Sequence, residues 1–130
     1  MGSPTNEPAR YDNETQHTVT LTKGFCMGKF EVTQAEYLAV MGSNPSYFTG
    51  DLSRPVEQVS WNDATNYCAQ LTERERSAGR LTAGCGYRLP TESEWEYAYR
   101  GGDDHAIPLR KRVAFGDGEL RRALRVSAVW

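Results

Sequence analysis

The sequence has no long apolar run, few histidines, a small odd number of cysteines and no strong excess of either charge. No stretch approaches the roughly 20 apolar residues of a membrane-spanning helix. The formal net charge of −2 at pH 7 gives no general attraction to nucleic acid or to an anionic membrane. We therefore expect neither a nucleic-acid nor a membrane partner.

The N-terminus has no targeting segment that we recognise. Met1 leads directly into Gly2-Ser3-Pro4, without a basic region or an apolar core of a signal peptide. A cytoplasmic location is the default expectation, and the alternative is that the true N-terminus is missing.

The thiols and imidazoles do not have metal-ligand spacing. Cys26, Cys68 and Cys85 cannot all be paired, and no CxxC motif is present. We expect three unpaired thiols, at least one of them buried as a small apolar group. His17 and His105 are far apart in sequence and neither adjoins a cysteine.

What the sequence does contain is typical of one loop-rich domain, or part of one, with an aromatic core. The 130 residues include 12 Gly, 6 Pro, 7 Tyr and 3 Trp. Alternation of polar and apolar residues predicts a strand at 17–22 and another at 25–32, joined at Lys23-Gly24 as a hairpin.

Three helix starts are marked by capping signals. Thr33 with Glu36 predicts a helix over 34–41, ended by Gly42. Ser60 with Asp63 predicts a helix over about 61–77. A third helix follows Pro90, and Thr91 and Glu94 form the capping box at its start. Trp95 and Tyr99 form an aromatic face of this helix. Short strands and three short helices, without alternating βαβ units, predict an α+β fold.

Two blocks in combination carry a family resemblance. They are PVEQVSWNDA at 55–64 and YRLPTESEWEYA at 87–98, with MGS at 1–3 and GFCMGKFEVT at 24–33 as weaker support. In this order and spacing they resemble the N-terminal part of the formylglycine-generating-enzyme (sulfatase-modifying-factor) family. The matching signature residues are Trp61, Asp63, Arg88, Leu89, Pro90, Thr91, Glu94, Trp95 and Glu96.

The resemblance implies an incomplete C-type-lectin-like fold and an oxidoreductase family. Complete relatives of this kind oxidise a sulfatase cysteine to formylglycine with copper, dioxygen and a cysteine pair, and they also bind calcium. Because the family carries those cysteines and calcium loops in its C-terminal part, we assign no catalytic, cofactor-binding or metal residue here. We expect a truncated, inactive member without copper or calcium, whose full-length relative has a sulfatase-like protein substrate.

An alternative function is a non-catalytic, lectin-like module that binds a protein or a glycan. Its candidate contacts are the loop aromatics Tyr47, Phe48 and Trp130, although aromatics in such loops more often anchor the loop to a core. We expect Tyr47 and Phe48 to do so.

Residues 1–100 and 101–130 differ in character. The first part has a formal charge of −4 and the second of +2, and the resemblance stops abruptly after Arg100. The basic run fits a solvated tail better than a nucleic-acid contact, because no supporting fold or aromatic pattern accompanies it. Shifting a back-translated Asp103–Lys111 by one base can give TTTRFHYGN, which resembles the family sequence after this helix. We therefore expect 101–130 to be an unrelated, frameshift-derived tail.

The remaining suggestive residues have structural interpretations. Glu94 is expected to cap its helix, while Glu92 and Glu96 make polar contacts or lie in solvent rather than act as a catalytic acid and base. Trp61 and Trp95 are expected in the core, and Arg88 in a buried salt bridge for which Glu96 is one candidate. We also expect residues 1–100 to be marginally stable or prone to aggregate unless another chain completes them.

Overall fold

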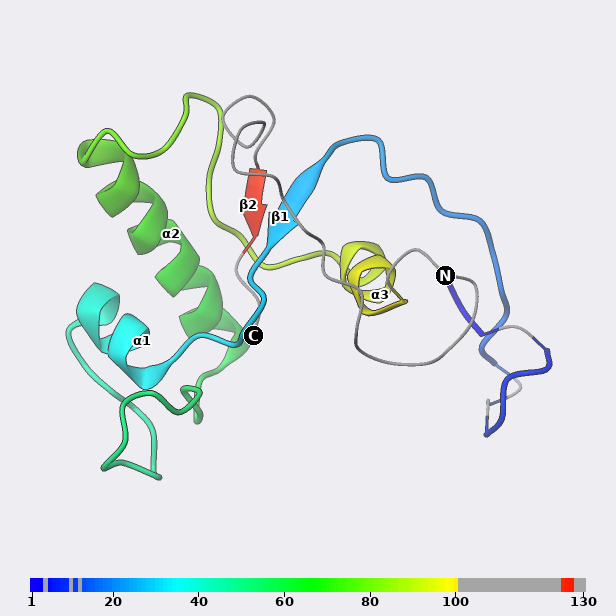
Figure 1. Ribbon diagram of the computed structural model, residues 1–130, viewed down its shortest axis with the longest axis horizontal. Helices are drawn as coiled ribbons and strands as arrows, with labels where there is room; N and C mark the ends of the chain where they lie inside the picture. The colour runs from blue at the N-terminus through cyan, green and yellow to red at the C-terminus, as the bar shows by residue number, and fades with distance from the viewer. Residues whose placement is uncertain (4, 10, 12, 101–124, 128–130) are drawn as a thin grey trace.

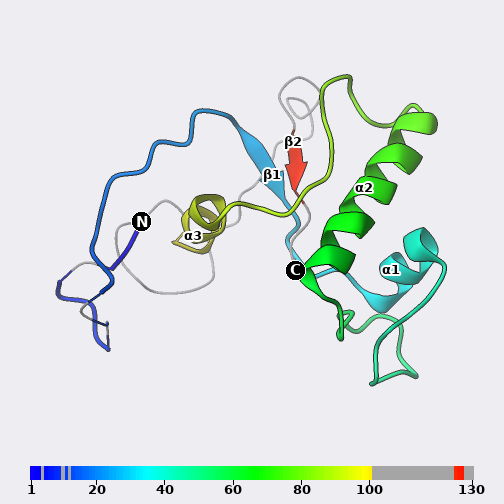
Figure 2. The ribbon, with the colours of Figure 1, turned by 180° about the vertical axis from the view of Figure 1, so that it is seen from behind.

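The computed structural model describes residues 1–3, 5–9, 11 and 13–100, together with the backbone of 125–127. In chain order the elements are β1 (Phe25–Met27), α1 (Gln34–Met41), α2 (Trp61–Ser77), α3 (Glu92–Arg100) and β2 (Arg125–Ser127). Helices α1 and α2 lie together at one end, α3 and the N-terminus lie at the other, and the strands lie between them (Figure 1). The view from behind shows the same separation (Figure 2).

The predicted helices are confirmed, because their boundaries depend on local hydrogen bonds. At the start of α1, the Thr33 hydroxyl accepts from the Glu36 amide, and the Thr33 amide donates to Glu36 Oε2 at 2.8 Å. Gly42 ends this helix in the left-handed conformation, with φ of 76°, and its amide donates to the Leu38 carbonyl. Helix α2 starts with the same arrangement at Ser60 and Asp63.

The predicted hairpin of 17–22 with 25–32 is wrong. Strand β1 pairs in parallel with β2, with Cys26 opposite Val126, and the described chain has no strand at 17–22. The period-two pattern predicts which side chains share a face but not which strand covers them. Val19 remains 40% exposed, so the first segment has no apolar surface that would hold it as a strand.

The core lies between α1 and α2. Tyr37 and Tyr67 stack with ring centroids 5.4 Å apart and an interplanar angle of 7°, and Val32 and Cys68 complete the buried cluster. Partly buried apolar residues pack around it: Val40, Met41, Val56, Val59, Leu71, Tyr87 and Leu89. This small core fixes the segment after β1 and the two helices relative to one another.

A fully buried glutamine connects the core to the loop after α1. Gln34 Nε2 donates to the carbonyls of Phe48 (3.0 Å) and Pro55 (3.4 Å), and its Oε1 accepts from Asn44 Nδ2 (2.9 Å). Since Gln34 is fully withdrawn from water, these hydrogen bonds satisfy an amide that would otherwise be costly to bury. The sequence gives no sign of this role, because a glutamine at the start of a helix is unremarkable.

None of the described helices combines the length and the apolar character that crossing a bilayer requires.

Candidate functional site

The signature residues before α3 form an ion pair that is also a helix cap. Arg88 donates to both carboxylate oxygens of Glu94, at 2.7 and 2.5 Å, and Glu94 Oε2 accepts from the Thr91 amide at 2.8 Å. The bonded Arg88 guanidinium lowers the pKa of Glu94 to about 2. The predicted capping role of Glu94 is confirmed, and Leu89, next to Arg88, packs against the core.

Glu96 was one candidate partner for Arg88, and that pairing is wrong. A carboxylate at the third position of a helix turns back toward the cap and the residues before it, which brings Glu94 rather than Glu96 to Arg88. Glu96 instead accepts from Arg100 Nε at 2.9 Å, one turn farther along α3. Glu92 is exposed.

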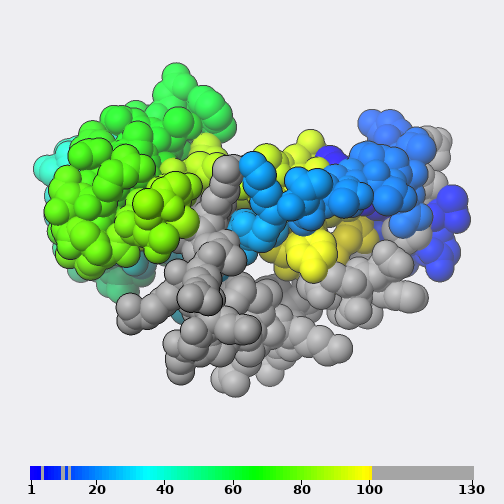
Figure 3. Space-filling view, turned by 90° about the horizontal axis from the view of Figure 1, so that it is seen from above, coloured from blue at the N-terminus to red at the C-terminus, as the bar shows by residue number. Residues whose placement is uncertain are grey.

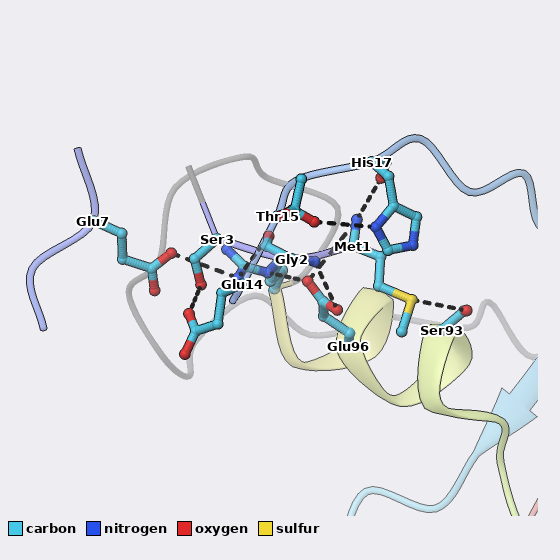
Figure 4. Close-up of polar contacts among 10 residues, drawn as sticks. Met1, Gly2, Ser3, Glu7, Glu14, Thr15, His17, Ser93 and Glu96 are labelled. Atoms are coloured by element: carbon cyan, nitrogen blue, oxygen red, sulfur yellow. Dashed lines mark hydrogen bonds and ion pairs between the residues drawn. The ribbon is translucent and has the colours of Figure 1, made fainter. Parts of the chain in front are cut away.

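The MGS block packs against α3 around Glu96, as Figure 4 shows. The Gly2 amide donates to Glu96 Oε2 at 3.3 Å, and the Ser93 hydroxyl lies 3.3 Å from the Met1 sulfur. Arg100 joins the same group: it donates to the Gly2 carbonyl at 3.3 Å and lies 3.6 Å from Glu7. Residues more than 90 positions apart in sequence therefore meet here.

This meeting point borders a mostly polar hollow of about 550 Å³. Gln16, His17, Tyr97 and Arg100 contribute to its walls. Glu96 forms an ion pair with Arg100, and Arg88 holds Glu94 as a carboxylate. A general acid at neutral pH needs a raised pKa, which the depressed pKa of Glu94 does not provide. The geometry therefore supports a structural role for these two carboxylates.

A second hollow, of about 940 Å³, lies between the segment after β1 and α2. Its described lining includes Cys26, Phe30, Val32, Tyr67 and Leu71. Burial of Tyr67, with the negative charge of Glu36 as a smaller cause, raises the pKa of its hydroxyl to about 12. The walls of this hollow are mostly apolar, with Lys29, Glu31 and Glu36 among the lining residues.

The expectation that Trp61 and Trp95 lie in the core is wrong. Trp61 is 71% exposed at the first position of α2. Trp95 is 48% exposed and stacks on Tyr99, with centroids 5.3 Å apart, on a helix that makes no extensive contact with another described element.

Tyr47 and Phe48 also differ from expectation, since both are exposed rather than anchored in a core. Their rings meet edge to face at 5.1 Å. The loop is held instead by its backbone: the amides of both residues donate to Glu57 Oε1, the second at 2.9 Å. Trp130, the third candidate, and His105 lie outside the described residues.

Two of the three cysteines are buried, and none of the three is in a disulfide. Cys26 is 8% exposed and Cys68 2% exposed, while Cys85 is intermediate. Burial raises the pKa of the Cys26 thiol, which disfavours the thiolate that copper(I) binds. Across the part of the chain that the structure describes, no group of three His, Cys, Asp or Glu could hold a metal ion. These residues do not fit the copper or calcium sites that the family implies.

Comparison with known proteins agrees with the motifs. The chaperone protein LppX of Paenibacillus barcinonensis is 39% identical, over 65% of this chain and 38% of that protein. The formylglycine-generating enzyme of Streptomyces coelicolor is 46% identical, over 55% of this chain and 17% of the enzyme. The inactive C-alpha-formylglycine-generating enzyme 2 of Bos taurus is 49% identical, over 39% and 12%. No solved structure matches the chain significantly.

The chain thus spans 38% or less of the length of these three relatives. The profile of one family, the sulfatase-modifying factor enzyme 1-like domain, matches residues 1–123, which extends past the boundary expected near residue 100. With the signature residues gathered around the start of α2 and along α3, and with this match over most of its length, the chain belongs to the sulfatase-modifying factor enzyme 1-like (formylglycine-generating-enzyme) domain family.

Proposed function

We propose that this chain is the N-terminal, scaffold-forming part of a formylglycine-generating-enzyme-type domain and does not oxidise a sulfatase cysteine on its own. The observation that carries the proposal is that the candidate reactive side chains are buried or take part in caps and ion pairs. Glu94 caps a helix and pairs with Arg88, Glu96 pairs with Arg100, and Cys26 and Cys68 are buried. Each of these side chains has a structural role, which supports the view that none of them acts on a substrate.

The family membership directs which reaction to test. The matched formylglycine-generating enzymes point to a cysteine-containing sulfatase peptide as the substrate of a complete domain. In this chain we propose that the same family sequence supplies the framework on which that chemistry is built. The C-type-lectin-like architecture of such a framework is part of the proposal.

Activity of the purified chain tests this proposal directly. The chain would be incubated with copper(I), dioxygen and a cysteine-containing sulfatase peptide, and the peptide would be analysed by mass spectrometry for the aldehyde product. The Streptomyces coelicolor enzyme serves as the positive control. We expect no product and no copper retained after gel filtration; stoichiometric copper with repeated turnover contradicts the proposal.

A second candidate function rests on the exposed aromatic pair. Tyr47 and Phe48 are 74% and 61% exposed and stand on a loop whose backbone Glu57 holds in place. Rigid aromatic groups in a loop are suited to contacts with a sugar ring or a protein surface. Binding in a glycan or protein screen that is lost in Tyr47→Ser/Phe48→Ser and kept in Trp61→Ser supports this function.

The origin of residues 101–130 stays a proposal. We propose a shifted reading frame for this stretch, although the family match through residue 123 and the pairing of β2 with β1 weigh against an unrelated tail. The nucleotide sequence tests the frameshift: codons whose shifted frame cannot give a family-like sequence exclude it.

A further inference from the structure

Helix α3 carries an aromatic ridge that the described residues leave about half exposed. Glu92, Trp95 and Tyr99 are three and four residues apart, so they lie along one face of the helix. The rings of Trp95 and Tyr99 are nearly parallel, at 5°, and the two residues remain 48% and 50% exposed. We refer to Trp95 and Tyr99 as the α3 ridge.

The other side of α3 contacts β1 and the N-terminal segment. Tyr97 meets Phe25 of β1 edge to face, with centroids 6.5 Å apart. Figure 3 shows α3, in yellow, beside the blue N-terminal segment and apart from the green atoms of α2. An amphipathic helix of a folded domain normally buries its apolar face, and the described residues provide only part of the surface that would bury this ridge.

The ridge is nevertheless held in place at both ends of the helix. Arg88 and Thr91 fix Glu94 at the start, and Arg100 with the Gly2 backbone fixes Glu96 in the last turns. A stacked aromatic pair on a fixed helix loses little conformational freedom when it is covered. This is the property that makes rigid aromatic groups strong contacts in interfaces.

We propose that the α3 ridge is the docking surface for the portion of the family domain that this chain does not span. The chain covers 17% of the Streptomyces coelicolor enzyme and 38% of LppX, so most of each relative lies outside the part that this chain matches. The inference rests on the proposed scaffold role and assigns it a partner and a contact surface.

Charge specifies the partner further. Helix α3 contains three glutamates and one arginine, and Glu92 stands exposed at the end of the ridge. Glu94 and Glu96 are paired with Arg88 and Arg100, so Glu92 is the charge that this face presents. Two copies of the face would bring their Glu92 side chains together, and an anionic surface would also repel Glu92. The complementary surface is therefore apolar, with a basic side chain placed to meet Glu92.

Fluorine NMR tests the docking with a built-in control. The full chain would carry 5-fluorotryptophan, with resonances assigned through Trp61→Phe, Trp95→Phe and Trp130→Phe. The unlabelled probe is the segment of the Streptomyces coelicolor enzyme that follows its match to this chain, co-expressed with the chain or added to it. We expect the Trp95 resonance to shift on complex formation, while that of Trp61, which is more exposed and lies outside the ridge, stays in place.

Two substitutions separate docking from folding. Trp95→Ala is expected to weaken the complex at least about tenfold, and Trp61→Ala less than about twofold. Because Trp95→Ala could also disturb α3, the exposed Glu92→Lys provides a second measurement: we expect weaker binding with reduced salt dependence and an unchanged circular dichroism spectrum.

The outcomes are distinguishable from those of the activity assay. No complex, a shift of Trp61 rather than Trp95, or self-association through Trp95 in the absence of the probe overturns the docking proposal. Turnover by the chain alone overturns the scaffold proposal, whatever the probe does.

Discussion

Replacing Gln34 with leucine tests whether one buried amide holds the loop after α1 to the core. Gln34→Leu keeps nearly the same volume but removes the bonds to the Phe48 and Pro55 carbonyls and to Asn44. Removing these three partly buried hydrogen bonds costs about 3–4 kcal/mol, because each contributes about 1 kcal/mol or somewhat more. Burial of the added apolar surface returns about 1 kcal/mol. The expected net loss is therefore about 2–3 kcal/mol.

Urea unfolding followed by circular dichroism measures this loss. Gln70→Leu is the matched control, since Gln70 lies on the exposed side of α2 and is expected to change stability by less than about 0.5 kcal/mol. Adding Asn44→Ala to Gln34→Leu should cost less than the sum of the two single changes, because the two residues share a hydrogen bond. Equal losses for Gln34→Leu and Gln70→Leu, or full additivity with Asn44→Ala, would refute the reasoning.

Three further predictions concern single groups. The pKa of Glu94 is lowered to about 2 by Arg88, below its ordinary value of about 4.3, so its stabilisation is complete above pH 4.3 and is lost as pH falls toward 2. Glu94→Gln should cost about 1–2 kcal/mol at pH 7 in urea unfolding, since Arg88 is partly exposed, and should flatten the pH dependence below pH 4.3; an unchanged acid limb contradicts this. Gly42→Ala should cost about 1 kcal/mol in thermal unfolding, because φ of 76° is unfavourable for alanine although nothing lies near its Cβ, and Gly42→Asn should cost less. Burial raises the pKa of Tyr67 to about 12, so its contribution to stability is present below pH 10 and lost as pH rises through 12; absorbance at the tyrosinate band should show a late ionisation that Tyr67→Phe removes.

The helices could be predicted from sequence because their signals are local. Thr33 and Glu36, or Ser60 and Asp63, lie three residues apart and need no other part of the chain to form a cap. The same locality explains why the role of Glu94 was predicted correctly.

The strand pairing and the environment of the tryptophans could not be predicted in the same way. The partner of β1 lies about 100 residues along the chain, and hydrophobic periodicity does not identify a distant partner. Trp61 and Trp95 are apolar residues in well-formed helices, yet their burial depends on whether another surface meets them. Residue type alone therefore predicted a core position that the structure does not show.

Only the local features of the candidate site could be predicted from the sequence. Its motifs could be recognised in the sequence, but the approach of Gly2 to Glu96 and of Arg100 to Glu7 joins segments more than 90 residues apart. Nothing in the spacing of these residues indicates those contacts. The family resemblance supplied the order of the blocks and not their geometry.

Gln34 also constrains how this protein can change over evolution. Its side chain has a fixed reach, and it must meet Asn44, Phe48 and Pro55 at the same time. Inserting or deleting a residue between positions 44 and 55 would displace at least one of these groups, although this is a surface loop of the kind that usually tolerates length variation. We therefore expect the length of this loop to be less variable than its sequence, with the restriction imposed by a residue that lies outside it.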